Sequence, residues 1–297
     1  MKFISLLILA LVLGACASKP KEIQPTEIKP TIAFEISEGI LHPESIIYSA
    51  KHEAFFVSNV ASGNPLETKA VGYLSKISKD GKTITAKWIT GLHAPKGLAI
   101  VGDDLYVTDV TRVHKISILK SKITKTFKVK NSKFLNDTVA DAQGNVYVSD
   151  MYSNILYRIQ KNKLAIWLQD AKLDHPNGLF TDGKEHLMVV KWGGEIDLKT
   201  MQTKTPGDMA IVPFAKTSEI FVNKDIQGNL DGISVDAKGV LWISDWMNGD
   251  VFTMNKQGQV KKMFNLGQGT ADITVAKELN LLMVPQMYQN KLIFIQL

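Results

Sequence analysis

The sequence predicts an all-β fold, a six-bladed β-propeller in which an N-terminal strand closes the last blade. Six segments repeat one pattern, in which an apolar strand passes through a turn into a second strand. One position is shared by all six copies and is occupied in turn by Glu44, Lys96, Asn136, Asn177, Asp231 and Ala271, at intervals of 40 to 54 residues. Such spacing, with about four short strands per repeat, is typical of propeller blades. Beyond the first residues, no stretch shows sustained helical apolar spacing.

Residues 1–15 have the form of an export signal. Lys2 precedes an apolar run, residues 3–13, that is shorter than the ~18 residues needed to span a bilayer. The run ends in Leu-Gly-Ala-Cys, which resembles the lipobox of bacterial lipoproteins and implies lipidation of Cys16. Ala17 follows, in place of the aspartate that the resemblance associates with inner-membrane retention. We therefore expect a cell-envelope lipoprotein on the periplasmic side of the outer membrane; a plain secretory signal is the alternative.

Residues 16–30 are rich in Lys, Pro and Glu, which is typical of a flexible tether between lipid and domain. Cys16 is the single cysteine, so the exported protein must fold without an internal disulfide. We expect the propeller domain to occupy residues 31–297 and to be a monomer. The net charge of +6 rests almost wholly on lysine, since Arg112 and Arg158 are the two arginines. Base and phosphate recognition favour arginine, so no nucleic-acid partner is expected.

The expected strands follow the chain in order. The second strands of the six copies begin at Phe55, Leu105, Val146, Leu187, Leu241 and Leu281. Further pairs are expected at residues 72–77 with 83–88 and at 155–159 with 164–168, joined by short turns. The last copy ends after three strands, whereas residues 31–36 form a spare strand before the first copy. Pairing these closes the ring and removes an open sheet edge.

The shared positions start the inner strands, so their side chains should meet on one face of the channel. Two carboxylates and two amide oxygens, from Glu44, Asn136, Asn177 and Asp231, make a hard ligand set that suits Ca²⁺, with another divalent cation as an alternative. Zinc is disfavoured because none of the four is cysteine or histidine. A purely structural explanation is that the Asn-Gly and Asp-Gly pairs only make turns at the start of a blade.

These residues carry a resemblance to the regucalcin/gluconolactonase (SMP-30/gluconolactonase/LRE-like) family of six-bladed propellers, which is related to the paraoxonases and diisopropylfluorophosphatase. The resemblance implies that Glu44, Asn136, Asn177 and Asp231 surround a catalytic divalent cation. One departure is that Glu44 is followed by Ser-Ile-Ile-Tyr, where the family usually has Gly-Pro-x-Trp. The chain therefore resembles a divergent branch, and the family's sugar-lactone substrates are not carried over.

The resemblance implies calcium-dependent hydrolysis of a lactone or related ester, a small-molecule substrate. Asp231 would be the catalytic general base, and Asn136 would contact substrate as well as metal. The alternative is a non-catalytic propeller that binds a partner or ligand and uses its metal for rigidity, because one propeller fold serves many functions. Lys96 would bind an anionic part of the substrate, or else form a salt bridge with Asp272.

Other features near the channel have two explanations each. The loop at residues 60–71 is either a lid or an ordinary surface loop. His42, His93 and His175 are either bases at the rim or solvated loop residues. The tryptophans 192, 242 and 246 and Met247 either wall an apolar pocket or pack the blades. We expect the acids at the ends of second strands, Asp109, Asp150 and Asp245, to cap loops through local hydrogen bonds.

Overall fold

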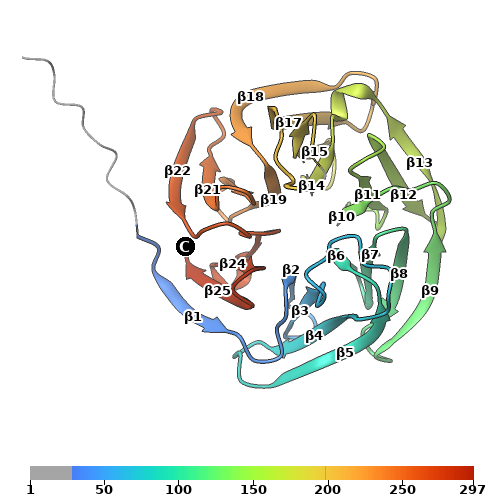
Figure 1. The fold of residues 1–297 in the computed structure, drawn as a ribbon, viewed down its shortest axis with the longest axis vertical. Coiled ribbons are helices and arrows are strands. Elements are labelled where there is room, and N and C mark those ends of the chain that lie inside the picture. The colour runs from blue at the N-terminus through green and yellow to red at the C-terminus, as the bar shows by residue number, and fades with distance from the viewer. Residues whose placement is uncertain (1–28, 198) are drawn as a thin grey trace, which may run out of the picture.

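The computed structural model describes residues 29–197 and 199–297, which form six antiparallel β-sheets arranged as a ring around a channel (Figure 1). The predicted signal, Cys16 and most of the predicted tether lie outside these residues. The described part contains no α-helix, only the short 3-10 helices η1 (Ala171–Leu173) and η2 (Lys277–Leu279). It accordingly holds no helix of the length and apolarity that crossing a membrane would require.

Each blade is one sheet whose inner strand borders the channel. Blade one comprises β2 (Pro43–Ser49), β3 (Ala54–Asn59), β4 (Gly72–Ser78) and β5 (Ile84–Leu92). Blade two comprises β6 (Pro95–Val101), β7 (Asp104–Asp109), β8 (Arg112–Ser117) and β9 (Lys122–Lys128). Blade three comprises β10 (Leu135–Ala140), β11 (Val146–Asp150), β12 (Ile155–Gln160) and β13 (Lys163–Gln169).

Blade four comprises β14 (Pro176–Thr181), β15 (His186–Lys191), β17 (Thr205–Pro213) and β18 (Phe221–Gly228), with the two-residue β16 (Gly193–Gly194) paired to the start of β17. Blade five comprises β19 (Leu230–Val235), β20 (Leu241–Asp245), β21 (Asp250–Met254) and β22 (Val260–Asn265). Blade six comprises β23 (Thr274–Ala276), β24 (Leu281–Gln286), β25 (Lys291–Gln296) and the N-terminal β1 (Ile32–Ile36). The predicted fold class is confirmed.

The ring closes as the sequence predicts, because β1 pairs antiparallel with the last strand, β25. Phe34 is opposite Phe294 in this register, and their rings stack with centroids 4.2 Å apart. The backbone N–H of Gln296 also donates to the carbonyl of Thr31. Both ends of the described chain therefore belong to one sheet, which leaves no unfinished blade (Figure 1).

The hydrophobic core lies between neighbouring blades. Phe55 of blade one, for example, is fully buried against Met283 and Phe294 of blade six. Strand residues that alternate between the two faces of each sheet supply these contacts, since both faces of a blade are covered by its neighbours. Tight packing between blades holds the inner strands at fixed positions around the channel.

The inner strands are interrupted at the shared position. In blades one to five the strand register shifts across this position, for example between Pro176 and Leu179 in β14 and between Leu230 and Ile233 in β19. Such β-bulges redirect a side chain away from the alternating pattern. Each bulge turns one residue into the channel, which is how a strand inside a packed sheet presents a functional group.

Candidate metal centre and cavity

The structure brings together the four side chains predicted as metal ligands. All four are buried, with exposed fractions of 1% for Asn177, 5% for Glu44 and Asp231, and 6% for Asn136. Nδ2 of Asn136 donates to Oδ1 of Asn177, and Nδ2 of Asn177 donates to Oδ1 of Asp231 at 2.8 Å and to the carbonyl of Leu230 at 2.9 Å. Three blades are thus joined by one line of amide and carboxylate groups.

Two of these residues are followed by a glycine, and it is the close approach of the neighbouring inner strand, not a turn, that requires glycine there. Gly178 and Gly232 lie within β14 and β19. A Cβ added to Gly178 would collide with the carbonyl oxygen of Asp231, and one added to Gly232 would collide with the backbone N–H of Ile273. The Asn-Gly and Asp-Gly pairs therefore place adjacent inner strands in contact, so the turn explanation of these pairs is wrong.

The channel concentrates negative charge. Burial raises the pKa of Glu44 well above its usual value, and the nearby Asp231 and Asp272 raise it further. Burial and Asp272 likewise raise the pKa of Asp231, against the effect of the hydrogen bond from Asn177. Carboxyl groups crowded in this way favour the protonated form unless a cation compensates them.

These residues fit a hard divalent cation. The buried Oε2 of Glu44 has no hydrogen-bond partner within the described residues, although buried carboxylate oxygens are normally paired. The other proposed ligand atoms are carboxylate and amide oxygens, the ligand types preferred by Ca²⁺ and Mg²⁺. An unpaired oxygen beside a second carboxylate is costly by itself and favourable in the presence of a cation.

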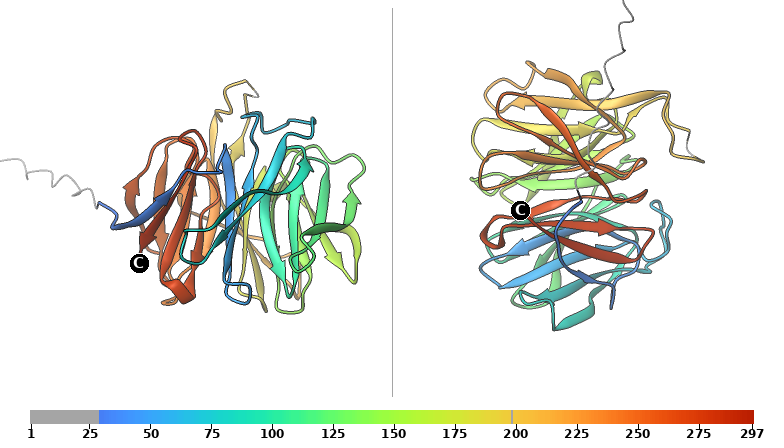
Figure 2. Two further views of the ribbon diagram at one scale, coloured as in Figure 1. Left: turned by 90° about the horizontal axis from the view of Figure 1, so that it is seen from below. Right: turned by 90° about the vertical axis from the view of Figure 1, so that its left-hand side faces the viewer.

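A cavity of about 430 Å³ opens above this group. Glu44, Asn136 and Asp231 line it at the channel side. Its walls come from blades three to six and include Phe134, Met151, Tyr152, Trp192, Trp246, Met287 and Tyr288. Two loops complete it, one at residues 60–71 and one containing residues 199–201. Figure 2 shows both loops rising from the same face of the ring, the second of them in yellow.

Lys96 is buried, lines the cavity and holds the first of these loops. Its Nζ donates to the carbonyl of Pro65 at 2.7 Å and to that of Ala94 at 2.9 Å, and it lies 4.8 Å from the centroid of the Phe134 ring. Burial lowers the pKa of Lys96 to about 8, although Glu44 opposes this effect. Among the described residues no carboxylate forms an ion pair with Lys96. Asp272 instead accepts a hydrogen bond from Oγ of Ser45 at 2.6 Å, so the predicted alternative of a Lys96–Asp272 salt bridge is wrong.

A series of hydroxyl groups that the sequence analysis did not single out holds the bulges in place. Oγ of Ser149 accepts the backbone N–H of Asp137 at 2.9 Å and donates to the carbonyl of Asn177 at 2.8 Å. Ser244 makes the equivalent bonds to Gly232 and Ala271. Each hydroxyl links the bulge of its own blade to the shared residue of the next. The recurrent Val-Ser and Ile-Ser pairs before the ends of second strands are the signal that could have identified them.

Two further buried carboxyl groups, Asp137 and Asp272, follow the shared positions of blades three and six. Asp137 accepts the backbone N–H groups of Thr138 at 2.6 Å and Leu179 at 2.5 Å. Burial raises the pKa of Asp137 well above its usual value, and Asp272 adds to this effect. Burial raises the pKa of Asp272 to about 7, against the hydrogen bond from Ser45. Both add to the crowding of carboxyl groups in the channel, which a cation would compensate.

The acids that end second strands act as the sequence predicts. Oδ1 of Asp109 accepts the backbone N–H groups of His93 and Ala94, and Asp150 accepts those of Lys133 and Phe134. Asp245 accepts the N–H of Asn248. In blades two and three these bonds fix the chain immediately before the inner strand. The caps therefore help to place Lys96 and Asn136.

The three histidines considered as rim bases, His42, His93 and His175, are not among the described residues that line the cavity. Nδ1 of His42 is 3.1 Å from the carbonyl of Ala61, at the base of the loop at residues 60–71. Nδ1 of His175 is 3.1 Å from Oδ1 of Asp174. Burial lowers the pKa of His93. Of the residues predicted to wall a pocket, Trp192 and Trp246 line the cavity. Trp242 instead packs between blades five and six, and Met247 packs against the cluster that contains Trp192.

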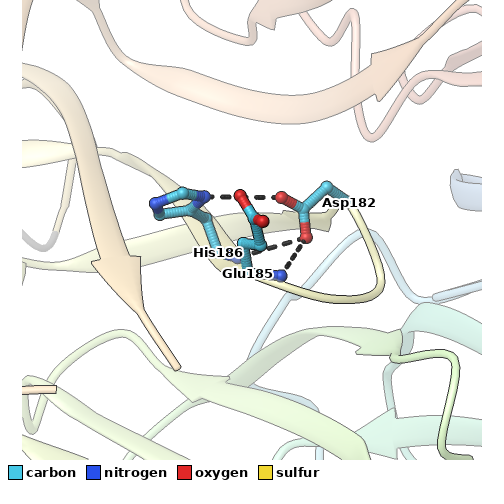
Figure 3. Close-up of side chains that lie close together, drawn as sticks. All are labelled: Asp182, Glu185 and His186. Atoms are coloured by element: carbon cyan, nitrogen blue, oxygen red, sulfur yellow. Dashed lines mark hydrogen bonds and ion pairs between the residues drawn. The ribbon is translucent and has the colours of Figure 1, made fainter. Parts of the chain in front are cut away.

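A second acidic group lies outside the channel, where Asp182, Glu185 and His186 gather in the turn between β14 and β15 (Figure 3). Oδ1 of Asp182 accepts the backbone N–H groups of residues 184, 185 and 186 at 2.7–3.1 Å. These bonds lower the pKa of Asp182 against the opposing effect of burial. The cluster belongs to a capped surface turn, and the turn alone explains why its three side chains lie close together.

The fold is a six-bladed β-propeller with a group of buried carboxylate and amide side chains in its channel. Residues 42–282 match the model of the SMP-30/Gluconolactonase/LRE-like region, and the chain belongs to this family, which is generally metal-dependent. No match is found among curated protein sequences.

Solved propellers share the fold at low sequence identity. A catalytically inactive virginiamycin B lyase from Staphylococcus aureus with quinupristin is 13% identical, with a TM-score of 0.60 over 91% of this chain and 100% of that chain. The hydrazine synthase of Kuenenia stuttgartiensis is 13% identical, with a TM-score of 0.59 over 88% and 97%. A chain of a nidogen/laminin complex is 15% identical, with a TM-score of 0.56 over 75% and 89%.

Proposed function

We propose that this protein is a calcium-dependent hydrolase of a lactone or related ester. The observation that carries the proposal is that Asn136, Asn177 and Asp231 are joined by hydrogen bonds and lie with Glu44, whose Oε2 is unpaired, at the floor of a cavity. Glu44, Asn136, Asn177 and Asp231 would hold the cation. When bound there, the cation would polarise a carbonyl group and stabilise the negative charge that develops on its oxygen.

The residues of the chain itself would position and activate the reactants. Asp231 lines the cavity and would take a proton from water as the general base. The hydrogen bond from Asn177 fixes its orientation. Asn136 lines the same cavity and is within reach of a substrate there. The loop held by Lys96 covers part of the opening and limits access of bulk water, which strengthens electrostatic interactions inside.

The test is hydrolysis of a panel of sugar lactones, alkyl lactones and phosphotriesters by the wild type and by Asp231→Asn. Loss of a general base typically costs 10²–10⁴-fold, so kcat/KM should fall by about that factor. Asp182→Asn is the matched control, because it alters the exposed acidic turn and should retain full activity. Activity on no member of the panel, or activity indifferent to Asp231→Asn, would favour a non-catalytic binding ring.

We also propose that the chain is anchored through a lipid on Cys16 in the bacterial outer membrane, facing the periplasm. The lipobox-like residues 13–16 support this proposal. Expression in a Gram-negative host should place the wild type in the membrane fraction, and Cys16→Ser should move it to the soluble fraction. Membrane retention of Cys16→Ser at the wild-type level would contradict lipid anchoring.

A further inference from the structure

We propose that the substrate carries a long apolar substituent, such as an alkyl chain, and is not a polyhydroxylated sugar lactone. This inference rests on the proposed function, because it names the substrate class of the same site. The cavity walls are mainly apolar, whereas the channel floor carries carboxylate and amide groups.

The walls are mainly apolar, and the polar residues above the channel floor are Asn64, Lys96, Lys199 and Thr200. The Phe134 and Tyr152 rings stack with centroids 5.0 Å apart, and the Trp246 ring lies 5.7 Å from that of Trp192 and 5.2 Å from that of Tyr288. Met151 and Met287 line the cavity between these aromatic groups. Thioether and aromatic groups adapt well to alkyl chains and gain free energy by removing them from water.

Several polar atoms of these walls are already paired within the protein. Nε1 of Trp192 donates to the carbonyl of Met201 at 3.0 Å, and the Tyr152 hydroxyl contacts Sδ of Met201 at 3.6 Å. Oδ1 of Asn64 accepts the N–H of Leu66 within its own loop. Two of the three N–H donors of Lys96 are likewise taken by backbone carbonyls.

A sugar lactone would lose hydration from several hydroxyl groups on entering this cavity. Each hydroxyl left without a partner costs free energy, because its hydrogen bonds to water are not replaced. An alkyl chain has no such requirement. The cavity is therefore polar at the reacting end and apolar where the remainder of the substrate must lie.

The rim continues the apolar wall to the surface. Leu66 and Tyr288 both line the cavity, yet they are 41% and 52% exposed. Large exposed apolar side chains gathered at the mouth of a pocket are typical of a binding surface. An alkyl chain longer than the interior can extend between Leu66 and Tyr288.

The inference predicts how the rate depends on chain length. In a series from γ-butyrolactone to γ-dodecalactone, kcat/KM should rise about fourfold for each methylene that the walls bury. D-glucono-δ-lactone should be the poorer substrate. Trp246→Ala should lower kcat/KM for γ-dodecalactone about tenfold or more and lower it less for γ-butyrolactone. Tyr288→Ala, at an exposed position, is a second variant that preserves folding. Phe221→Ala, 59% exposed on β18, is the matched control and should change neither substrate.

Binding of the lactams that correspond to the same γ-lactone series, up to the octyl lactam, separates this inference from the proposed function and is followed by tryptophan fluorescence. If no lactone is hydrolysed but lactam binding strengthens with chain length and weakens in Trp246→Ala, the apolar site stands and the hydrolase proposal fails. If Asp231-dependent hydrolysis shows no dependence on chain length, or favours the sugar lactone, the hydrolase stands and the apolar substrate is overturned. Absence of both hydrolysis and lactam binding overturns the inference.

Discussion

At the scale of single residues, short hydroxyl side chains determine where the channel groups lie. Ser149 and Ser244 each bond to a backbone N–H in their own blade and to a backbone carbonyl in the next. Ser149 connects the bulges that carry Asn136 and Asn177, and Ser244 connects the bulge that carries Asp231 to Ala271 of blade six. A hydroxyl is able to do this because it donates and accepts at once.

Ser149→Ala should therefore destabilise the protein and disturb the site. It leaves the N–H of Asp137 and the carbonyl of Asn177 unpaired, which costs about 1–3 kcal/mol for each buried group that is left unsatisfied. Urea unfolding measures the loss. Ser153→Ala is the matched control, because the Ser153 hydroxyl is buried without a hydrogen-bond partner, and it should change stability little. Equal effects of the two substitutions would contradict this role of Ser149.

Asp109 gives a pH-dependent prediction. Burial raises its pKa, but the hydrogen bonds from His114 and His93 and the charge of Arg112 outweigh burial and lower the pKa to about 2. The folded-state pKa is below the unfolded value, so the carboxylate stabilises the fold above about pH 4 and loses this effect as the pH falls toward 2. The shift corresponds to about 2 kcal/mol. The stability difference between the wild type and Asp109→Asn should shrink by this amount between pH 5 and pH 2 in urea unfolding, and a constant difference would contradict the assignment.

At the scale of elements, the loop at residues 60–71 is attached to the neighbouring blade. The carbonyl of Pro65 accepts a hydrogen bond from Lys96 of blade two, and the carbonyl of Ala61 lies beside His42. A hydrogen bond from blade two and a contact at its base hold a loop that would otherwise project into solvent (Figure 2). This attachment makes the loop part of the cavity. The loop can act as a lid only if the hydrogen bond between Lys96 and the carbonyl of Pro65 breaks.

Lys96→Met should release the loop while keeping most of the side-chain volume. A hydrogen bond from a charged donor contributes about 1.5–3 kcal/mol, so the open population of the loop should rise about tenfold or more. Limited proteolysis within residues 60–71 and amide hydrogen exchange measure this change. Lys115→Met is the control, because Lys115 pairs with Asp104 away from the cavity and should leave the loop protected. Unchanged protection in Lys96→Met would show that other contacts hold the loop.

At the scale of the whole molecule, closure of the ring brings acidic side chains from four different blades into one channel. Glu44, Asp137, Asp231 and Asp272 come from blades one, three, five and six and are all at least nine-tenths buried. Their mutual repulsion opposes closure of the ring, and the packed blade interfaces and the β1–β25 pairing offset it. A divalent cation in the channel would remove much of this repulsion.

Cation binding should therefore stabilise the ring. At a concentration of about 100 times its dissociation constant, Ca²⁺ adds about 2.7 kcal/mol. At ~2–4 °C per kcal/mol for a chain of this size, the melting temperature should rise by roughly 5–11 °C over the chelated protein. Glu44→Gln should reduce the shift, and Asp182→Asn, in the exposed turn, should keep it. Parallel melts with Mg²⁺ and Zn²⁺ identify the preferred ion. No shift with any of these ions would contradict the metal centre.

The sequence by itself determined the architecture and the shared positions at which the proposed ligands lie, because the repeat defines both. A shared position at regular intervals fixes a ring, and the spare strand at residues 31–36 requires a partner at the C-terminus. Glu44, Asn136, Asn177 and Asp231 could be chosen because they occupy one register.

Only the tertiary structure decided what surrounds these positions. The contact of Lys96 with Pro65, the pairing of Asp272 with Ser45, and the separation of Trp242 from Trp192 and Trp246 depend on blade-to-blade packing. Repetition encodes which residues are equivalent. It does not encode which atoms of neighbouring blades touch, because that depends on the twist of each sheet and the volume of every side chain between them.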